Sequence, residues 1–302
     1  MSEFKQLSVA TDFSEDALQA VQRAALLATE HQASLELLHV LNGPSLQTLA
    51  EMFRNPAEAE QKLSADAAQM LDDVARQVSA ATGAGVEVTP LVRIGRVREE
   101  ILKVAERTDL LVLGARGTRV LRDLLLGTTT EALVRKSRRP VLVVKRPAET
   151  PYRDVLVPVD FSTASVAALH AATAVAPDAQ ITVFHAFAVA FEGKLWLAGV
   201  SNDEIVAHRL AARQRALDAI DALIAALDDD PRRFVPIVEH GDPALTILDC
   251  EKASGAELIV MGKQGDSPLE DLLLGSVTRH VLADSVCDVL VVEPGVPGPA
   301  AA

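Results

Sequence analysis

Residues 111–130 read LVLGARGTRVLRDLLLGTTT, and this stretch decides the fold. An apolar run is followed by Gly114, by Gly117 three residues later, and by Gly127 and Thr128 after nine further residues. Glycine has no Cβ, so the backbone N–H groups of such a loop can approach an anion closely. A hydroxyl residue that opens the following helix is typical of the same kind of site. We therefore expect this loop to bind the phosphates of a nucleotide.

The same stretch occurs a second time. Residues 258–278 read LIVMGKQGDSPLEDLLLGSVT and hold, at matching spacing, Gly262, Gly265, Gly275 and Ser276. An offset of 148 residues relates the two sets of glycines and also carries Asp12 onto Asp160. Between these landmarks, His39 pairs with His185 and Gly95 with Gly241 at an offset of 146. The chain is therefore a tandem repeat, best explained by gene duplication.

Each repeat alternates short apolar runs with helical patterns, as parallel strands joined by right-handed crossovers require. In the first repeat we expect strands at residues 7–10, 35–40, 86–92, 110–114 and 141–145, and helices at residues 14–29, 58–79, 97–107 and 128–136. The second repeat follows the same order. The predicted fold is α/β, with two similar open doubly wound domains, each with a five-stranded parallel sheet flanked by helices. Ligands are expected at the carboxyl ends of the strands.

Prolines and glycines refine this prediction. Asn42, Gly43 and Pro44 indicate the start of a long connection, and Pro56 breaks that connection before the next helix. Pro90 favours an edge position for its strand, because proline cannot donate a ladder hydrogen bond. Thr128 and Glu131 form a T-x-x-E pattern, which predicts a capping box at the start of the helix.

The pattern G-x2-G-x9-G-[S/T] after a hydrophobic strand resembles the ATP-binding signature of universal stress proteins, and the whole chain resembles a tandem member of that family. Both copies keep every position of the signature. The resemblance implies a Rossmann-like fold, also described as adenine nucleotide alpha hydrolase-like, and ATP as the ligand. It implies two domains, at residues 1–146 and 152–294. Residues 295–302 have no core to join, and we expect them to form a disordered tail.

The resemblance also implies which residues bind the nucleotide. The glycines and the helix starts would line the phosphates and ribose, Val40 and Ala186 would pin adenine through backbone groups, and the two aspartates would lie beside the adenosine or a bound metal. In the first repeat the set is Asp12, Val40, Gly114, Gly117, Gly127, Thr128 and Thr129; in the second it is Asp160, Ala186, Gly262, Gly265, Gly275, Ser276 and Val277. The alternative for the aspartates is capping of the next helix, but Ser14 and Ser162 can provide those caps.

The repeats differ between their glycines. The first has Arg116 and Arg119, which could form charge-assisted bonds to phosphate, whereas the second has Lys263, Asp266 and Pro268. We therefore expect tighter triphosphate binding in the first repeat. Magnesium carried by the nucleotide is the favoured metal, because no cluster of histidines and cysteines stands out. His39 and His185 are interpreted as packed or surface residues.

Charge and composition limit the partners. The net charge is −13, with −1 on residues 1–150 and −12 on residues 151–302, so nucleic acid and anionic lipid are poor partners. No apolar run approaches the ~18 residues of a membrane span, and the N-terminus lacks a signal pattern, so we expect a cytoplasmic protein. Cys250 and Cys287 are interpreted as small buried hydrophobic residues.

Three functions compete at this point. The favoured one is a nucleotide-dependent regulatory or protective module of the stress response, with an unidentified protein partner. It would form an internal pseudo-dimer through the fifth strands of its domains, and the sequence also allows a homodimer of two chains. A slow ATPase is the second, although the chain lacks a G-x-x-x-x-G-K-[S/T] motif and a placeable pair of base and nucleophile. A different small ligand in the second domain is the third, and there Phe187, Phe191 and Trp196 could form a lid, an oligomer contact or a core of their own.

Overall fold

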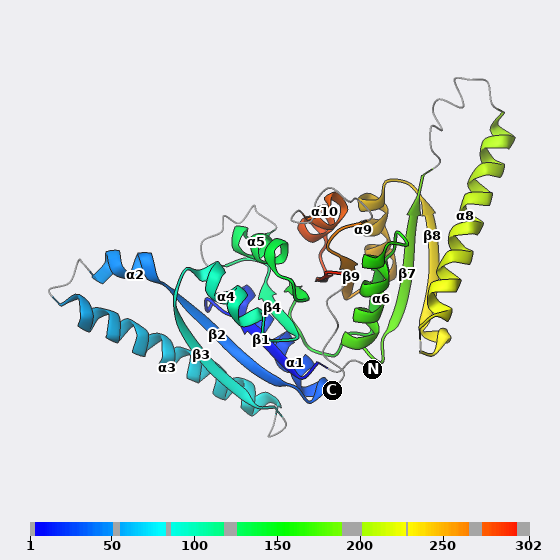
Figure 1. Cartoon of the computed structure of the whole chain (residues 1–302). Helices are drawn as coiled ribbons and strands as arrows, with labels where there is room; N and C mark the ends of the chain where they lie inside the picture. The colour runs from blue at the N-terminus through cyan, green and yellow to red at the C-terminus, as the bar shows by residue number, and fades with distance from the viewer. Residues whose placement is uncertain are drawn as a thin grey trace. The chain divides into compact units, whose positions relative to one another are not determined.

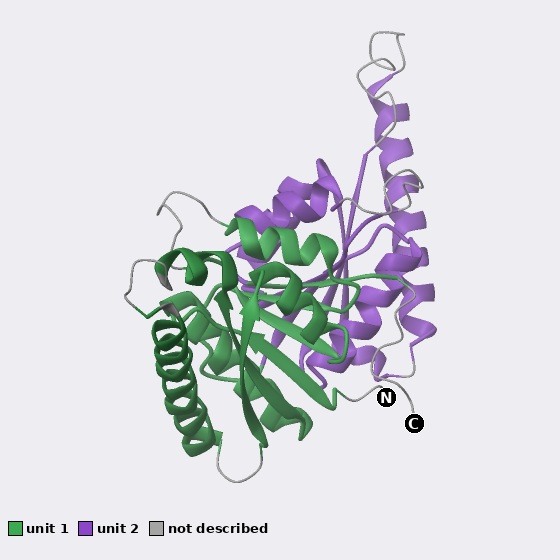
Figure 2. Ribbon diagram, turned by 60° about the vertical axis from the view of Figure 1, so that its left-hand side comes forward, with its two compact units in different colours: residues 1–151, 288–302 green, residues 152–287 purple. Residues whose placement is uncertain are grey.

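In its computed structural model, the chain forms two compact units (Figure 2). One unit comprises Met1–Pro151 with Asp288–Ala302, and the other comprises Tyr152–Cys287. The structure describes residues 4–50, 55–82, 86–117, 126–188, 201–227, 229–265 and 274–294. The expected tail and the residues Arg119, Phe191, Trp196, Asp266 and Pro268 lie outside this described part.

The first unit has a mainly parallel sheet built from the first repeat. The elements of that repeat, in chain order (Figure 1), are β1 (Gln6–Ala10), α1 (Glu15–His31), β2 (Ser34–Asn42), α2 (Gly43–Ala50), α3 (Pro56–Thr82), β3 (Val88–Gly95), α4 (Val97–Ala105), β4 (Leu110–Gly114), α5 (Thr128–Lys136) and β5 (Val141–Val144). The strand order is β3-β2-β1-β4-β5, and these neighbours are parallel. Strand β10 (Asp288–Val292) then pairs antiparallel with β5, with Val289 opposite Val143.

The second unit repeats this arrangement. Its elements are β6 (Asp154–Pro158), α6 (Thr163–Val175), β7 (Gln180–Phe187), α8 (Asn202–Ala225), the 3-10 turn η2 (Pro231–Arg233), β8 (Phe234–His240), α9 (Pro243–Ser254), β9 (Leu258–Gly262) and α10 (Ser276–Asp284). Its strands run β9-β6-β7-β8 and are parallel, which matches β4-β1-β2-β3 of the first unit. The α/β fold with mostly parallel sheets flanked by helices is thus confirmed.

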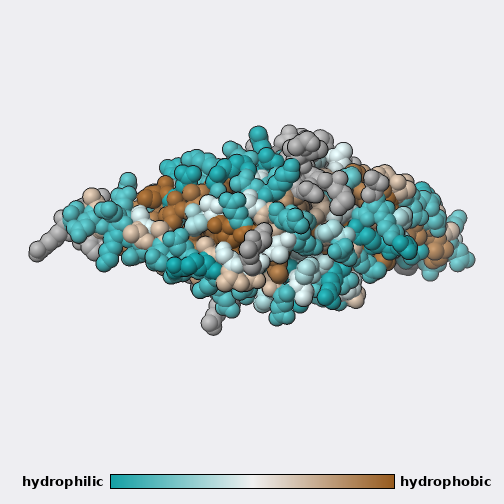
Figure 3. All heavy atoms as spheres, turned by 90° about the horizontal axis from the view of Figure 1, so that it is seen from below, coloured by the Kyte–Doolittle hydropathy of each residue, from teal (hydrophilic) through white to brown (hydrophobic). Residues whose placement is uncertain are grey.

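Aliphatic residues explain why both faces of each sheet are covered. All five residues of β4 are buried, and Leu7 and Val9 of β1 are fully buried. In the first unit, α1 packs on β1, β4 and β5, while α4 packs on β2, β3 and α5. Strands covered on both sides need continuous apolar runs, which the Leu-rich and Val-rich segments supply. The surface seen in Figure 3 is mostly hydrophilic, with small hydrophobic areas between.

The strand order places the ligand region. From β1 the chain crosses over to β2 and then β3 on one side of β1, whereas β4 and β5 lie on the other side. The strand order therefore reverses between β1 and β4. Such a switch point opens a crevice beyond the carboxyl ends of the strands. The loops that follow β1 and β4 are those that carry Asp12 and the glycine motif.

Two predictions about proline are resolved by the structure. The edge position of Pro90 is confirmed, because β3 is the last strand of the sheet and pairs with β2 alone. The long connection after Asn42 was wrong, because α2 begins there at once and α3 begins at Pro56 itself. The Asn42 side-chain oxygen accepts the N–H of Ser45 at 3.2 Å. Asn-Gly-Pro therefore opens a helix, where a missing N–H costs nothing.

Among the described residues, no helix combines the length and the apolar character that crossing a bilayer would require. Cys250 and Cys287 are both buried, as expected. Burial, with a smaller contribution from the charge of Glu239, raises the pKa of the Cys250 thiol to about 11.

Candidate functional site

The first glycine of each motif is required by helix packing. Gly114 ends β4, and a Cβ added there would lie 2.7 Å from the backbone oxygen of Asp16 at the start of α1. Gly262 ends β9, and its added Cβ would lie 2.6 Å from the Cβ of Ala164 in α6. These glycines therefore allow the first helix of each repeat to approach the sheet closely at the switch point.

The second glycine of each motif faces the predicted aspartate. A Cβ on Gly117 would lie 2.6 Å from Oδ2 of Asp12, and a Cβ on Gly265 would lie 2.5 Å from Oδ2 of Asp160. The loops after β1 and β4 thus meet at this point, as do those after β6 and β9. Each repeat brings a carboxylate directly against the glycine loop.

A strained turn orients each aspartate. Phe13 has φ 62°, in the left-handed region that bulky residues rarely adopt. The N–H of Ser14 donates to Oδ1 of Asp12 at 3.1 Å, and the Ser14 hydroxyl caps α1 by accepting the N–H of Ala17. Ser14 is therefore the helix cap, and Asp12 is left to face the glycine loop. The second repeat has the same turn, with Phe161 at φ 67° and Ser162 as the cap.

The two histidines hold these turns in place. Nδ1 of His39 lies 2.8 Å from the carbonyl oxygen of Thr11, and its ring lies 4.6 Å from the ring of Phe13. His185 repeats this arrangement with the carbonyl of Val159 and the ring of Phe161. Both histidines are thus packed residues, as interpreted from the sequence.

The third glycine caps the helix, so the capping-box prediction was wrong. Gly127 is the N-cap of α5, and no side-chain bond caps this helix. The Gly127 N–H donates to the Ala115 carbonyl at 2.8 Å, and the Thr130 hydroxyl donates to the Gly114 carbonyl at 2.9 Å. Thr128 is therefore the first helical residue rather than its cap. Within the described chain, the N–H groups of Thr128 and Thr129 have no partner, as is usual for the first turn of an uncapped helix.

The end of β2 offers another set of backbone groups. The N–H of Thr11 donates to the carbonyl of Leu38 at 2.8 Å, and the pairing of β1 with β2 stops there, while β2 continues to Asn42. Val40 lies two residues further, so its N–H and C=O point to the same side as those of Leu38. In the described residues these two groups meet no partner on that side.

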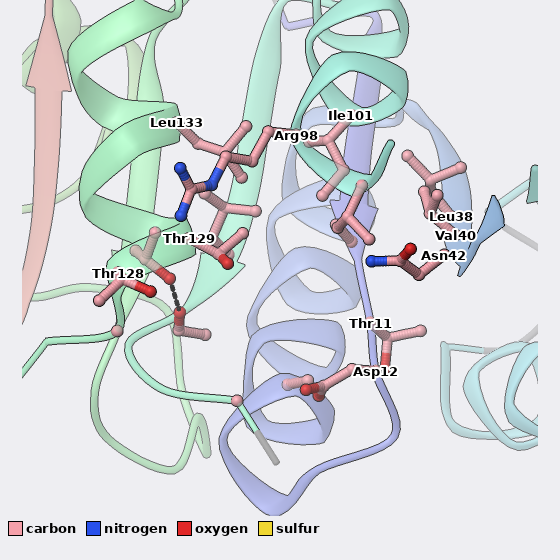
Figure 4. Close-up of a pocket in the computed structure, with 18 of the residues that line it drawn as sticks. Thr11, Asp12, Leu38, Val40, Asn42, Arg98, Ile101, Thr128, Thr129 and Leu133 are labelled. Atoms are coloured by element: carbon pink, nitrogen blue, oxygen red, sulfur yellow. Dashed lines mark hydrogen bonds between the residues drawn. The ribbon is translucent and has the colours of Figure 1, made fainter. Parts of the chain in front are cut away.

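These features surround one cavity of about 1020 Å³ in the first unit. It is lined by all seven residues predicted for the first repeat: Asp12, Val40, Gly114, Gly117, Gly127, Thr128 and Thr129. Figure 4 shows the end of β2 on one side of the cavity, α5 on the other, and α4 across the top. Leu38, Val40 and Ile101 provide an apolar wall, and Thr128 and Thr129 provide a polar one.

Sequence reasoning missed several residues of the cavity. Asn42 of β2, Arg98 of α4 and Lys136 of α5 also line it. The side chain of Arg96 pairs with Glu99 at 3.1 Å, and that of Arg116 pairs with Asp16 at 2.8 Å. The helix α4 begins just beyond the carboxyl end of β3, where a doubly wound sheet binds its ligand, but a lone arginine at a helix start gives no signal of its own in the sequence.

The residues predicted for the second repeat occupy equivalent places. Gly275 is the N-cap of α10, with Ser276 and Val277 as its first residues, and Ala186 lies near the end of β7. Asp160 is held by several hydrogen bonds, since its Oδ1 accepts from the N–H and hydroxyl of Ser162 and from the hydroxyl of Ser165. Burial tends to raise the pKa of Asp160, but these hydrogen bonds together lower it below its ordinary value.

The described residues include no group of three or more His, Cys, Asp or Glu side chains that could hold a metal ion. Two carboxylates lie at the glycine loop of the first unit: Asp12 faces Gly117, and Asp16 is paired with Arg116. Mg²⁺ bound to a nucleotide fits such a site, since it usually takes one or two carboxylates and retains water and phosphate ligands.

Comparison with known proteins gives consistent findings. The model of the universal stress protein family matches the chain twice, at residues 3–145 and 151–293. The universal stress protein MJ0577 of Methanocaldococcus jannaschii is 30% identical over 160 residues, which are 47% of this chain and 96% of that protein. A universal stress protein of Mycolicibacterium smegmatis is 28% identical over 95% of this chain and 96% of its own length.

The fold itself is shared with a solved relative. The crystal structure of a universal stress protein from Archaeoglobus fulgidus matches with a TM-score of 0.73 at 21% identity, covering 96% of this chain and 98% of that chain. Both the family model and this structure therefore extend over the two repeats.

Proposed function

Because the chain belongs to the universal stress protein family and contains its domain twice, we propose that it binds ATP in the cavity of the first unit. In this proposal the protein is a nucleotide-dependent regulatory or protective module of the stress response. The observation that carries the proposal is the gathering of all seven predicted residues of the first repeat around one cavity. Its volume of about 1020 Å³ suits a nucleotide, because ligand cavities of this kind measure about 300–1,000 Å³.

The apolar wall holds the base. Leu38 and Ile101 cover the faces of a flat ring, and Val40 offers its unpaired N–H and C=O at the edge of β2. A donor and an acceptor on one residue match the acceptor and donor on the edge of adenine. The end of β2 would therefore bind adenine through backbone hydrogen bonds, as it would bind a neighbouring strand of the sheet.

The start of α5 holds the phosphates. The N–H groups of Thr128 and Thr129 point out of the first turn, where the helix dipole favours negative charge. Gly117 has no side chain, which leaves room for the Asp12 carboxylate beside the loop. Asp12, held by its turn, accepts from a ribose hydroxyl or contributes one ligand to a Mg²⁺ that the phosphates carry.

The pairing of β5 with β10 supports a second proposal, the internal pseudo-dimer. The fifth strand of the second repeat lies antiparallel to the fifth strand of the first, with Val291 opposite Val141. Paired fifth strands also leave no free edge at β5, which reduces the tendency to associate through that edge.

The experiment that tests ATP binding uses the purified full chain. Small molecules released on denaturation are identified by mass spectrometry, and phosphate release is measured on the same sample. Retained ATP without turnover supports the regulatory module, and rapid turnover would make the protein an enzyme. A different metabolite, or failure to bind added ATP with a Kd below about 1 mM, would overturn the proposal.

A further inference from the structure

Arg98 is an unusual residue in the first cavity. It occupies the first turn of α4, where the helix dipole disfavours a cation, and in the described part of the chain its guanidinium forms no hydrogen bond or ion pair. In Figure 4 its side chain extends from α4 towards α5, on the side where Leu133 and Thr129 are labelled, and Arg98, Thr128 and Thr129 line the same cavity. A cation in this place lowers helix stability slightly, so its presence favours a role in binding.

The two neighbouring arginines, by contrast, each form an ion pair with a carboxylate. Arg96 is engaged by Glu99 and Arg116 by Asp16, so part of their charge is already balanced. Arg98 therefore carries the uncompensated charge that faces the N-terminal turn of α5. Together, the guanidinium and the N–H groups of Thr128 and Thr129 would contact a polyphosphate from two sides.

The second repeat lacks this cation. At the offset of 146 residues that pairs Gly95 with Gly241, Arg98 corresponds to Ala244. Both are the second residue of a helix, α4 or α9. Asp242 replaces Arg96 and caps α9 by accepting the N–H of Ala244 at 3.0 Å. Ala244 thus lies in the first turn of an ordinary capped helix, and that turn holds no cation.

Two more positions that hold a cation in the first cavity also lose their positive charge in the second repeat. At the offset of 148, Arg116 corresponds to Gln264 and Lys136 to Asp284, which pairs with His280 at 2.9 Å. The four cationic positions of the first cavity therefore hold two carboxylates, one alanine and one glutamine in the second repeat. The glycines are the same in both, so the repeats differ chiefly in the charge they present.

We propose that Arg98 makes the first unit selective for ligands with several phosphates, and that the second unit, with Ala244 in its place, makes no such selection. This inference rests on the proposed nucleotide binding of the first unit. The reasoning is electrostatic: ATP carries about four negative charges and adenosine none, so a cation opposite α5 distinguishes them while the apolar wall binds both.

The test compares the full-length chain with its Arg98→Gln variant by calorimetric titration of ATP, AMP and adenosine. Loss of one charge-assisted contact should raise the Kd for ATP about 10-fold, raise that for AMP less, and leave that for adenosine unchanged. The Arg135→Gln variant is the matched control, because Arg135 is exposed on α5 and does not line the cavity. It should leave all three affinities unchanged.

A salt series supplies an independent readout. The Kd of the unmodified chain for ATP should rise more steeply between about 20 mM and 200 mM salt than that of Arg98→Gln. Equal changes for ATP and adenosine, or equal salt slopes, would overturn the role of Arg98 even though ATP still binds. If the unmodified chain binds adenosine but does not bind ATP, the proposed function itself is wrong, whatever the role of Arg98. A thermal scan should show that Arg98→Gln is folded, because this side chain stabilises no other described residue.

Discussion

Replacing Gly117 by alanine should weaken ATP binding in the first unit without unfolding it. No left-handed φ is required at Gly117, so alanine can adopt its backbone conformation. The new Cβ would, however, lie 2.6 Å from Oδ2 of Asp12, whereas ordinary van der Waals contact begins at 3.4 Å. The Asp12 carboxylate must therefore turn away from the loop by close to 1 Å.

The magnitude follows from the bond that this movement breaks. Oδ1 of Asp12 accepts the N–H of Ser14 at 3.1 Å, and a hydrogen bond to a charged group contributes about 1.5–3 kcal/mol. Loss of this bond in the bound state, where Asp12 also contacts the ligand, should raise the Kd for ATP about 10- to 150-fold.

Gly265→Ala is the matched control in the second unit. Its Cβ would lie 2.5 Å from Oδ2 of Asp160, an equally close approach. Asp160 is held by Ser162 and Ser165, so displacing it should destabilise the fold at least as much as the change at Gly117. The tight ATP site should nevertheless be unaffected.

Calorimetric titration with ATP and thermal unfolding, performed on both variants, provide the two readouts. The expected pattern is a weakened tight site in Gly117→Ala alone, with loss of thermal stability in both. Equal weakening in the two variants would refute the ranking of the sites. Unchanged affinity in Gly117→Ala would refute the role assigned to Asp12.

Three further predictions concern stability and reactivity. Asp288→Asn should cost about 3–5 kcal/mol in chemical denaturation, because it leaves the side chain of Arg23, 7% exposed, without its charge partner; the double variant with Arg23→Met should recover most of the loss. Since hydrogen bonds lower the pKa of Asp160, its contribution to stability should be complete above its ordinary pKa of about 3.9 and be lost as pH falls through the lowered value. Ser165→Ala should therefore shift acid unfolding, followed by circular dichroism, to higher pH. Cys250 should react with a thiol reagent at about pH 8 only after denaturant is added, as its pKa is raised to about 11; rapid reaction of the native chain would contradict its burial.

Strands and helices were largely predictable because the chain is strongly patterned. Continuous apolar runs such as that of residues 110–114 can be satisfied only between two layers of helices, which restricts the fold to a parallel α/β sheet. The exception was α2. Its Asn-Gly-Pro start is chemically the same as a turn, and only the bond from the Ser45 N–H to Asn42 distinguishes a helix opening from a loop.

The site was predictable as far as the glycine motif extends. The motif placed the loop, and its position after a strand indicated which residues would meet there. It could not reveal that Thr128 begins α5 without a side-chain cap, because T-x-x-E is compatible with either arrangement. The strained turn at Phe13 was also hidden, since phenylalanine gives no sign of a left-handed backbone.

Arg98 could not be singled out from one repeat, because a lone arginine at a helix start resembles any solvated charge. Its significance depends on three-dimensional neighbours: it faces α5 across the cavity, and its counterpart Ala244 cannot. Aligning the two repeats residue by residue would have shown that Arg98 corresponds to Ala244, but only the structure shows that Arg98 lines the cavity.

The geometry also limits what the glycine signature can establish. Gly114 and Gly262 are required by the close packing of α1 on β4 and of α6 on β9, so each repeat would need its first glycine whether or not it binds a nucleotide. Gly127 and Gly275 likewise cap a helix in both. A duplicated signature is therefore proof of a shared scaffold. The ligand must be inferred from the side chains that line the cavity. At the four positions that hold cations in the first cavity, the second repeat has two carboxylates, one alanine and one glutamine.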